Sequence, residues 1–427
     1  MQQVTRKKLA EGVHLTCVTT PKFKRAVIRT ALLLPLGGPD SALRACLPHV
    51  LRRGTRALPD LRAIGEALDG LYGARIEAVV RREGEQLAVG FLSDCIDESC
   101  APGADGLTAG VIRLLAELLY DPYTQDGAFC PDYTAGEREN LLDRIAAQKN
   151  DPCVWVPLRL TQLMCADEPY GQPVHGTKEQ AEKINEKKLY AAYQRALDEA
   201  QLELFYCGPL AADAVETLFA QTPLAQPRPK ALPLLPTVVL PQPAGEAREV
   251  VEEEPVTQAK LSLGFRTGGA SLTGGDPAAY WVFQTLYGGS TSSKLFLNVR
   301  EKQSLCYYAS AQFIAPKGIM MVNSGIENDK FAVARDEILR QLDACREGDI
   351  TDAEIDGARR TLATNWGAML DDPLTLERYW LGQAAAGTMV SAEERIAQVQ
   401  TVDRARIVAA AQATTLDMVY LMKGAAK

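Results

Sequence analysis

Residues 26–38 read Ala-Val-Ile-Arg-Thr-Ala-Leu-Leu-Leu-Pro-Leu-Gly-Gly, an apolar run that ends in a pair of glycines. The run predicts a buried strand, and the glycines predict the turn that ends it. The residues that follow, 41–53, have the apolar spacing of a helix. The same order recurs in the second half, with a strand over 257–266, two glycines and a helix over 277–288. The sequence therefore predicts one structural unit used twice.

Both halves continue with a pair of strands, several helices and a closing strand. In the first half we expect strands over 12–20 and 25–36, a strand pair over 74–93, helices over 107–119, 135–148, 157–166 and 186–199, and a strand ending at Gly208. In the second half we expect a helix over 290–301, a strand pair over 305–325, helices over 328–346, 351–369, 373–386 and 402–412, and a strand over Met418–Met422. This order predicts an α+β fold with two similar domains, each a mostly antiparallel sheet with helices packed on one face.

Proline marks the boundary between the halves. Of the 24 prolines, eight lie between Pro223 and Pro255. Because proline fixes φ and removes a backbone donor, this density predicts an extended linker over 222–255, with a solvated acidic end. The 427 residues then divide into an N-terminal domain over 1–221 and a C-terminal domain over 256–427.

Composition excludes several classes of partner. The formal net charge of −8 argues against general binding to nucleic acid or to anionic membranes. No run of 18 apolar residues predicts a membrane span, and the N-terminal residues lack the apolar core of a signal peptide. The ten cysteines form no C-x-x-C pair, so we expect free thiols in a cytoplasmic protein.

Two local patterns were compared with known binding motifs. The glycine stretch Tyr287–Lys294 lacks the spacing of a phosphate-binding loop, and a turn that caps the next helix explains it better. The chain has only three histidines, and only His49 lies in a predicted helix, within Ala-Cys-Leu-Pro-His-Val-Leu-Arg-Arg-Gly-Thr over 45–55.

This stretch resembles the metal-binding helix of the insulinase/pitrilysin family of zinc peptidases, whose signature is His-x-x-Glu-His. Aligned on that signature, His49 takes the place of the second histidine, Ala45 that of the first, and Pro48 that of the glutamate. The family's third ligand is a glutamate on a later helix, and Arg144 stands at that position. A catalytic zinc needs three protein ligands, so the resemblance implies a domain without hydrolytic chemistry and without a metal of its own. An unrelated metal site formed by His49 and cysteines such as Cys46 stays open as an alternative.

A second motif is intact. Residues 292–307 resemble the family's C-terminal motif, in which an arginine and a tyrosine seven residues apart reach toward the zinc site of a facing domain. Arg300 and Tyr307 have that spacing. The resemblance implies that they bind the substrate backbone and stabilise the oxyanion of the tetrahedral intermediate. Without the resemblance, helix capping by Arg300 and packing of Tyr307 would explain them.

A strand in the first half also resembles the family. There an edge strand with an Asn-Ala pair binds extended substrate, and the matching residues here are Ile76, Glu77, Ala78 and Val79. Exposed strand edges bind peptides through main-chain hydrogen bonds. Glu77 replaces the usual asparagine, so an ordinary sheet strand is an equal alternative.

The resemblance implies three functions of decreasing expectation. The first is the Arg/Tyr subunit of a heterodimeric peptidase, which binds unfolded peptides, supplies Arg300 and Tyr307 to a zinc-bearing homologous subunit, and leaves zinc to that partner. The second is a scaffold or peptide-binding protein in a larger assembly. The third is a stand-alone zinc peptidase, which a metal analysis would decide. Whether the isolated chain forms a homodimer stays open.

Overall fold

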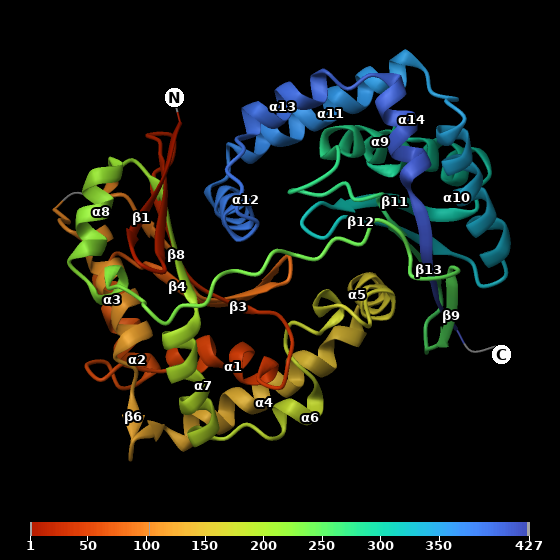
Figure 1. Ribbon diagram of the computed structural model, residues 1–427. Helices are drawn as coiled ribbons and strands as arrows, with labels where there is room; N and C mark the ends of the chain where they lie inside the picture. Colours follow the sequence, from red (N-terminus) through yellow and green to blue (C-terminus); the bar gives the residue numbers. More distant parts are fainter. Residues whose placement is uncertain (1, 102, 425–427) are drawn as a thin grey trace. The chain divides into compact units, whose positions relative to one another are not determined.

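Figure 1 shows the computed structural model of the chain, which describes residues 2–101 and 103–424. The chain forms two compact units, called unit 1 and unit 2 below. Unit 1 comprises Met1–Ala146, Gln172–Pro236 and Asp372–Gly387, and unit 2 comprises Ala147–Gly171, Thr237–Asp371 and Thr388–Lys427. Each unit therefore includes a segment from the opposite half of the sequence, which the predicted division at 222–255 does not contain.

Unit 1 is built on a six-stranded sheet in the order β1-β2-β8-β3-β5-β4. Its strands are β1 (Gln3–Ala10), β2 (Val13–Thr19), β3 (Arg25–Pro35), β4 (Arg75–Glu83), β5 (Gln86–Ile96) and β8 (Gln201–Gly208), with a small separate hairpin of β6 (Thr124–Gln125) and β7 (Ala128–Phe129). All neighbours in the large sheet pair antiparallel except β2 and β8, which are parallel. The order leaves β4 as an edge strand.

The helices of unit 1 lie on both faces of this sheet. They are α1 (Ser41–Leu51), α2 (Leu61–Gly70), α3 (Leu107–Tyr120), α4 (Pro131–Ala147), α6 (Lys178–Ala181), α7 (Glu186–Glu199), α8 (Ala212–Ala220) and, from the second half of the sequence, α12 (Pro373–Ala385); α4 ends one residue beyond the unit boundary. Buried residues of α1, α3, α7 and α8 form the main core with one sheet face. On the other face, α12 packs against β3, β4 and β8. Burial of β3 on both faces explains its uninterrupted apolar sequence.

Unit 2 contains a five-stranded sheet in the order β11-β12-β10-β13-β9. Its strands are β9 (Arg248–Glu253), β10 (Ala259–Arg266), β11 (Cys306–Ile314), β12 (Ile319–Ile326) and β13 (Thr415–Lys423). Here β13 and β9 pair parallel, and the other neighbours pair antiparallel. Unit 1 has the same arrangement, in which the parallel pair β2 and β8 lies beside three antiparallel strands that end at an edge hairpin. The predicted repeat is therefore visible in strand order.

Helices also lie on both faces of the unit 2 sheet. They are α5 (Pro152–Met164), α9 (Pro277–Gly288), a π-helix (Leu295–Lys302), α10 (Phe331–Arg346), α11 (Asp352–Met369), α13 (Ala392–Gln400) and α14 (Arg404–Ala413). The main core includes α9, α10, α11 and α14. On the other face, α5 packs against β10 and β13. Thus α5 in unit 2 and α12 in unit 1 have corresponding positions, and each comes from the opposite half of the sequence.

The α+β class predicted from the sequence is confirmed, with three differences in detail. The acidic stretch before Pro255, predicted to be solvated linker, forms β9 because its backbone pairs with β13. The helix predicted over 290–301 begins later, at Leu295, and is a π-helix. The helices predicted on one face of each sheet are joined by one helix on the other face. The sequence also did not predict β1, α2, α8 or α13.

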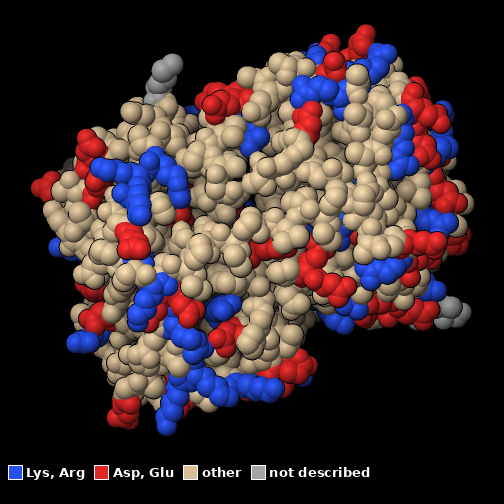
Figure 2. Space-filling view, in the orientation of Figure 1, with Lys and Arg blue, Asp and Glu red and all other residues tan. Residues whose placement is uncertain are grey.

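Charge and thiols agree with the composition. On the face shown in Figure 2, Lys and Arg side chains are interspersed with Asp and Glu side chains. All ten cysteines are free, and all except Cys100, Cys153 and Cys306 are buried. Within residues 2–101 and 103–424, no helix is both long enough and apolar enough to cross a membrane.

Candidate functional site

Arg300 is presented by the π-helix of unit 2. Leu295 and Val299 are buried and anchor this helix to the core, while the Arg300 side chain is 41% exposed. The guanidinium carbon lies 4.7 Å from the centre of the Phe296 ring, and a guanidinium nitrogen lies 3.4 Å from the Glu301 carboxylate. A π-helix is rare and is found mostly at functional sites. Its wider turn gives Arg300 a direction that a regular α-helix would not.

Tyr307 is presented by a β-bulge at the start of β11. Cys306 lies opposite Ile326 and Tyr308 lies opposite Gly325, so Tyr307 is an additional residue without a partner on β12. Bulges redirect side chains and are frequent beside active sites. The Tyr307 ring is 60% exposed, which makes it one of the most exposed aromatic side chains in the described residues.

Arg300 and Tyr307 line the same pocket, which has a volume of about 370 Å³. The other lining residues are Glu301, Ser304, Leu305, Cys306 and Glu327. Ser304, with a φ of 51°, makes the turn that joins the π-helix to β11. The structure thus brings together the two residues that the motif spacing selected, and their catalytic role stays a prediction.

The pocket offers hydrogen-bond donors rather than a nucleophile. A guanidinium and a phenol hydroxyl both donate to oxygen, as stabilisation of a developing oxyanion requires. The pocket's thiol is protonated at neutral pH, because burial raises the pKa of Cys306 more than Ser324 and Arg300 lower it. These groups alone can therefore bind a carbonyl or an oxyanion but do not supply an activated attacking group.

The second predicted site lies in unit 1, where α1 and α4 meet. The Arg144 Nη1 atom lies 2.9 Å from the His49 Nε2 atom. Ala45 and Pro48 are fully buried in α1 and have no side-chain atom that could bind a metal. The structure therefore brings His49 and Arg144 together, as the alignment with the zinc motif predicted.

These residues do not fit a zinc ion. Zinc requires neutral or anionic nitrogen, sulfur or oxygen ligands, and Arg144 instead places a cation beside the one histidine. The thiol of Cys46 is no substitute ligand, because burial raises its pKa to about 12. Throughout residues 2–101 and 103–424, no group of three or more His, Cys, Asp or Glu side chains could hold a metal ion.

The guanidinium of Arg144 also affects a second histidine. Burial lowers the pKa of His49 to about 4, and the nearby charge of Arg144 lowers it further. Burial and Arg144 also lower the pKa of His175 to about 4. Both imidazoles are neutral at pH 7, so the charge at this position comes from arginine. The sequence gave no reason to select His175, because it lies in a loop distant in sequence from α1.

These two histidines should make stability depend on pH. Their pKa values are near 4 in the folded protein and near 6.5 when unfolded, so the unfolded state binds more protons between these values. We expect the free energy of unfolding to fall as the pH falls from 6.5 toward 4. Urea unfolding of the wild type and of His49→Gln across this range measures the effect. An identical slope in both proteins would contradict the assignment to His49.

The predicted substrate strand is β4, and it lies at the edge of the unit 1 sheet. Glu77 is exposed, Ile76 is buried, and Ala78 and Val79 are half-buried. The Nε atom of Arg52 donates a hydrogen bond of 2.6 Å to the Ile76 carbonyl. The sequence did not single out Arg52, although it lies three residues after His49 and hence on the same face of the helix.

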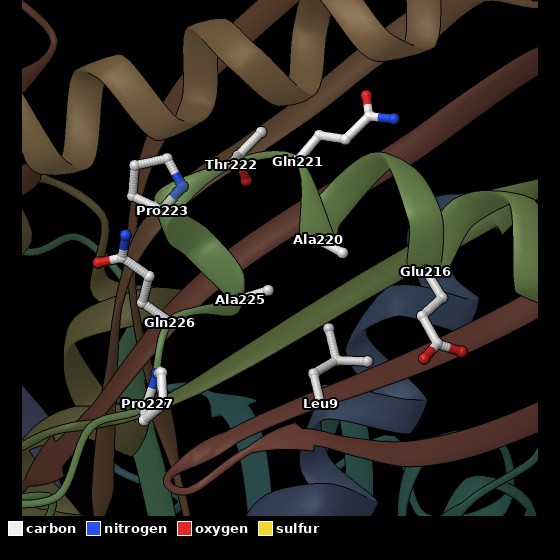
Figure 3. A pocket seen from close by; sticks show the side chains of 9 residues that line it. All are labelled: Leu9, Glu216, Ala220, Gln221, Thr222, Pro223, Ala225, Gln226 and Pro227. Carbon is white, nitrogen blue, oxygen red and sulfur yellow. The ribbon is translucent and has the colours of Figure 1, made fainter.

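Unit 1 has a further pocket, of about 430 Å³, formed by β1, α8 and the turn that follows α8 (Figure 3). The residues that line it are Leu9, Glu216, Ala220, Gln221, Thr222, Pro223, Ala225, Gln226 and Pro227. Its carboxylate, Glu216, lies 2.6 Å from the Lys7 ammonium. The lining thus contains amides, prolines and one neutralised charge, and no nucleophile paired with a base.

Comparisons with known proteins match this geometry. The family model "Peptidase M16 inactive domain" matches residues 183–362. A probable inactive metalloprotease of Bacillus subtilis, YmfF, is 33% identical over 413 residues, which are 97% of this chain and 96% of that protein. The crystal structure of a conserved protein from Enterococcus faecalis covers 99% of both chains with a TM-score of 0.89 and 26% identity. A peptidase M16 inactive domain from Pseudomonas fluorescens shares the fold, with a TM-score of 0.79, 19% identity and 99% of both chains covered.

The relative from Bacillus subtilis extends over nearly the whole of both chains, and the family resemblance inferred from the motifs is confirmed. This chain belongs to the M16 peptidase family, as an inactive homologue.

Proposed function

We propose that this chain is the non-metal subunit of a two-chain peptidase that cleaves unfolded peptides. One observation carries the proposal: Arg300 and Tyr307 line a single pocket. If the chain had only a scaffolding role, a π-helix and a β-bulge that direct a guanidinium and a phenol into one pocket would have no evident purpose.

The division of chemistry between two chains follows from what each residue set can do. In this chain Arg144 occupies the position of a zinc ligand, so the metal and the general base come from a homologous partner with an intact His-x-x-Glu-His. Arg300 and Tyr307 supply donors to the substrate carbonyl as negative charge develops on its oxygen. Main-chain groups of β4 pair with the extended peptide. We place this assembly in the cytoplasm, in keeping with the free thiols.

The experiment compares this chain, the zinc-bearing homologue encoded beside it, and an equimolar mixture. We expect this chain alone to contain less than stoichiometric zinc and to leave a quenched-fluorescent unfolded peptide intact. The mixture should cleave that peptide, and a chelator should stop it. The measurements are metal content by mass spectrometry and initial rates.

Two results would contradict the proposal. Equal rates for the mixture and the zinc-bearing chain alone would favour a scaffold or peptide-binding role. Stoichiometric zinc with chelator-sensitive cleavage by this chain alone would establish a stand-alone peptidase. Sedimentation of each preparation determines whether the isolated chain is a homodimer.

A further inference from the structure

The position where α1 and α4 meet has a cation without a counter-ion. Arg144 is half-buried, and among the described residues it forms no ion pair with an Asp or Glu side chain. Glu137, on the same helix, is already bound to Arg53, with 2.9 Å between Nε and the carboxylate oxygen. Holding a partly desolvated guanidinium without an opposite charge is unfavourable, and an arriving anion relieves that cost.

The groups around Arg144 leave donors unused. A guanidinium has five N–H donors, and the contact with His49 uses one nitrogen. His175, close enough for the charge of Arg144 to lower its pKa, has a buried Nδ1 atom without a hydrogen-bond partner in the described residues. Neither histidine carries charge at pH 7, so neither competes with Arg144 for an anion.

A second guanidinium connects this position to the edge strand. Arg52 lies three residues after His49 on one face of α1 and the residue that ends it, and its Nε atom binds the Ile76 carbonyl of β4. The two Nη atoms of Arg52 make no ion pair in the described residues. Both cations therefore lie near an edge whose main-chain groups can pair with an extended peptide.

We propose that Arg144, assisted by Arg52, binds a carboxylate of a peptide extended along β4. The site takes an anion where a zinc peptidase of this family would take a metal. Arginine is suited to this ligand because its planar fork matches the two oxygens of a carboxylate. The carboxylate can be a peptide C-terminus or an acidic side chain. The inference concerns this chain alone and does not depend on the proposed partner.

The test measures fluorescence anisotropy with the purified full chain and three labelled unfolded peptides of one sequence. One peptide ends in a free carboxylate, one in an amide, and one in an aspartate followed by an amide. We expect the free acid, the aspartyl amide or both to bind about tenfold more tightly than the plain amide. The pair that differs identifies the source of the carboxylate.

Arg144→Gln should abolish this preference while leaving the affinity for the plain amide unchanged, and Arg144→Lys should keep part of it. The matched control is Arg138→Gln on the same helix, where Arg138 binds only Glu139 and the preference should persist. Retained binding of the amide shows that Arg144→Gln is folded. Equal affinities for all three peptides, or a preference that survives Arg144→Gln, would overturn the proposal whether or not the mixture with a zinc chain cleaves peptides.

Discussion

Arg300→Ala should lower the kcat/KM of the mixed peptidase by about 10²–10³-fold, the cost typical of removing one oxyanion donor. The guanidinium is 41% exposed and does not hold the core together, because Leu295 and Val299 anchor its helix. Folding should therefore be unaffected. The loss should fall on kcat more than on KM, because the interaction strengthens as charge develops on the substrate oxygen.

Tyr307→Phe tests the same pocket with a smaller change. It removes one hydroxyl from an exposed ring and should cost about 10–10²-fold in kcat/KM. Lys302→Ala is the matched control, since Lys302 is exposed on the π-helix and does not line the pocket. Sedimentation must show that each variant still binds the zinc-bearing chain. If Arg300→Ala and Tyr307→Phe both match Lys302→Ala, the donor role is wrong.

Glu377→Ala should be the most damaging single substitution for stability, costing about 3–5 kcal/mol in the free energy of unfolding. Glu377 is completely buried in unit 1, where its two carboxylate oxygens accept hydrogen bonds of 2.9 and 3.0 Å from Arg81. Its Oε1 atom also lies 3.5 Å from Nε of Arg29. Arg29 is fully buried, and burial lowers its pKa to about 10, so it is charged at pH 7. Alanine would leave that charge buried without its nearest carboxylate.

The measurement is urea unfolding of the full chain, with Arg378→Ala as control. Arg378 is the next residue of α12, and its exposure predicts a change within about 0.5 kcal/mol. Glu377→Gln should fall between the two, because glutamine keeps the volume and one acceptor but loses the charge. A midpoint for Glu377→Ala equal to that of Arg378→Ala would show that the buried cluster is not a determinant of stability.

The sequence predicted most strands and helices because their apolar residues recur with the correct period. β3 and α9 are examples, with predicted bounds close to the observed ones. β9 was missed because its glutamates resemble a solvated linker, and only pairing with β13 makes it a strand. The positions of α5 and α12 could not be predicted, because an apolar helix face does not specify which sheet it covers.

The candidate sites show a similar limit. Spacing and context were sufficient to select Arg300 and Tyr307, and alignment was sufficient to select His49 and Arg144. The π-helix and the β-bulge depend on how the connection through Ser304 fits between the core and β12, and single-sequence periodicity contains no such information. The contact of Arg52 with β4 is likewise a tertiary contact.

The bond between Arg144 and His49 has a consequence for how this position responds to its surroundings. A bound metal can be withheld, exchanged or stripped away, so its charge varies with supply. An arginine side chain is covalently part of the protein and stays protonated at every physiological pH. The positive charge at this position is therefore inherited with the sequence, and neither metal starvation nor a chelator can switch it off.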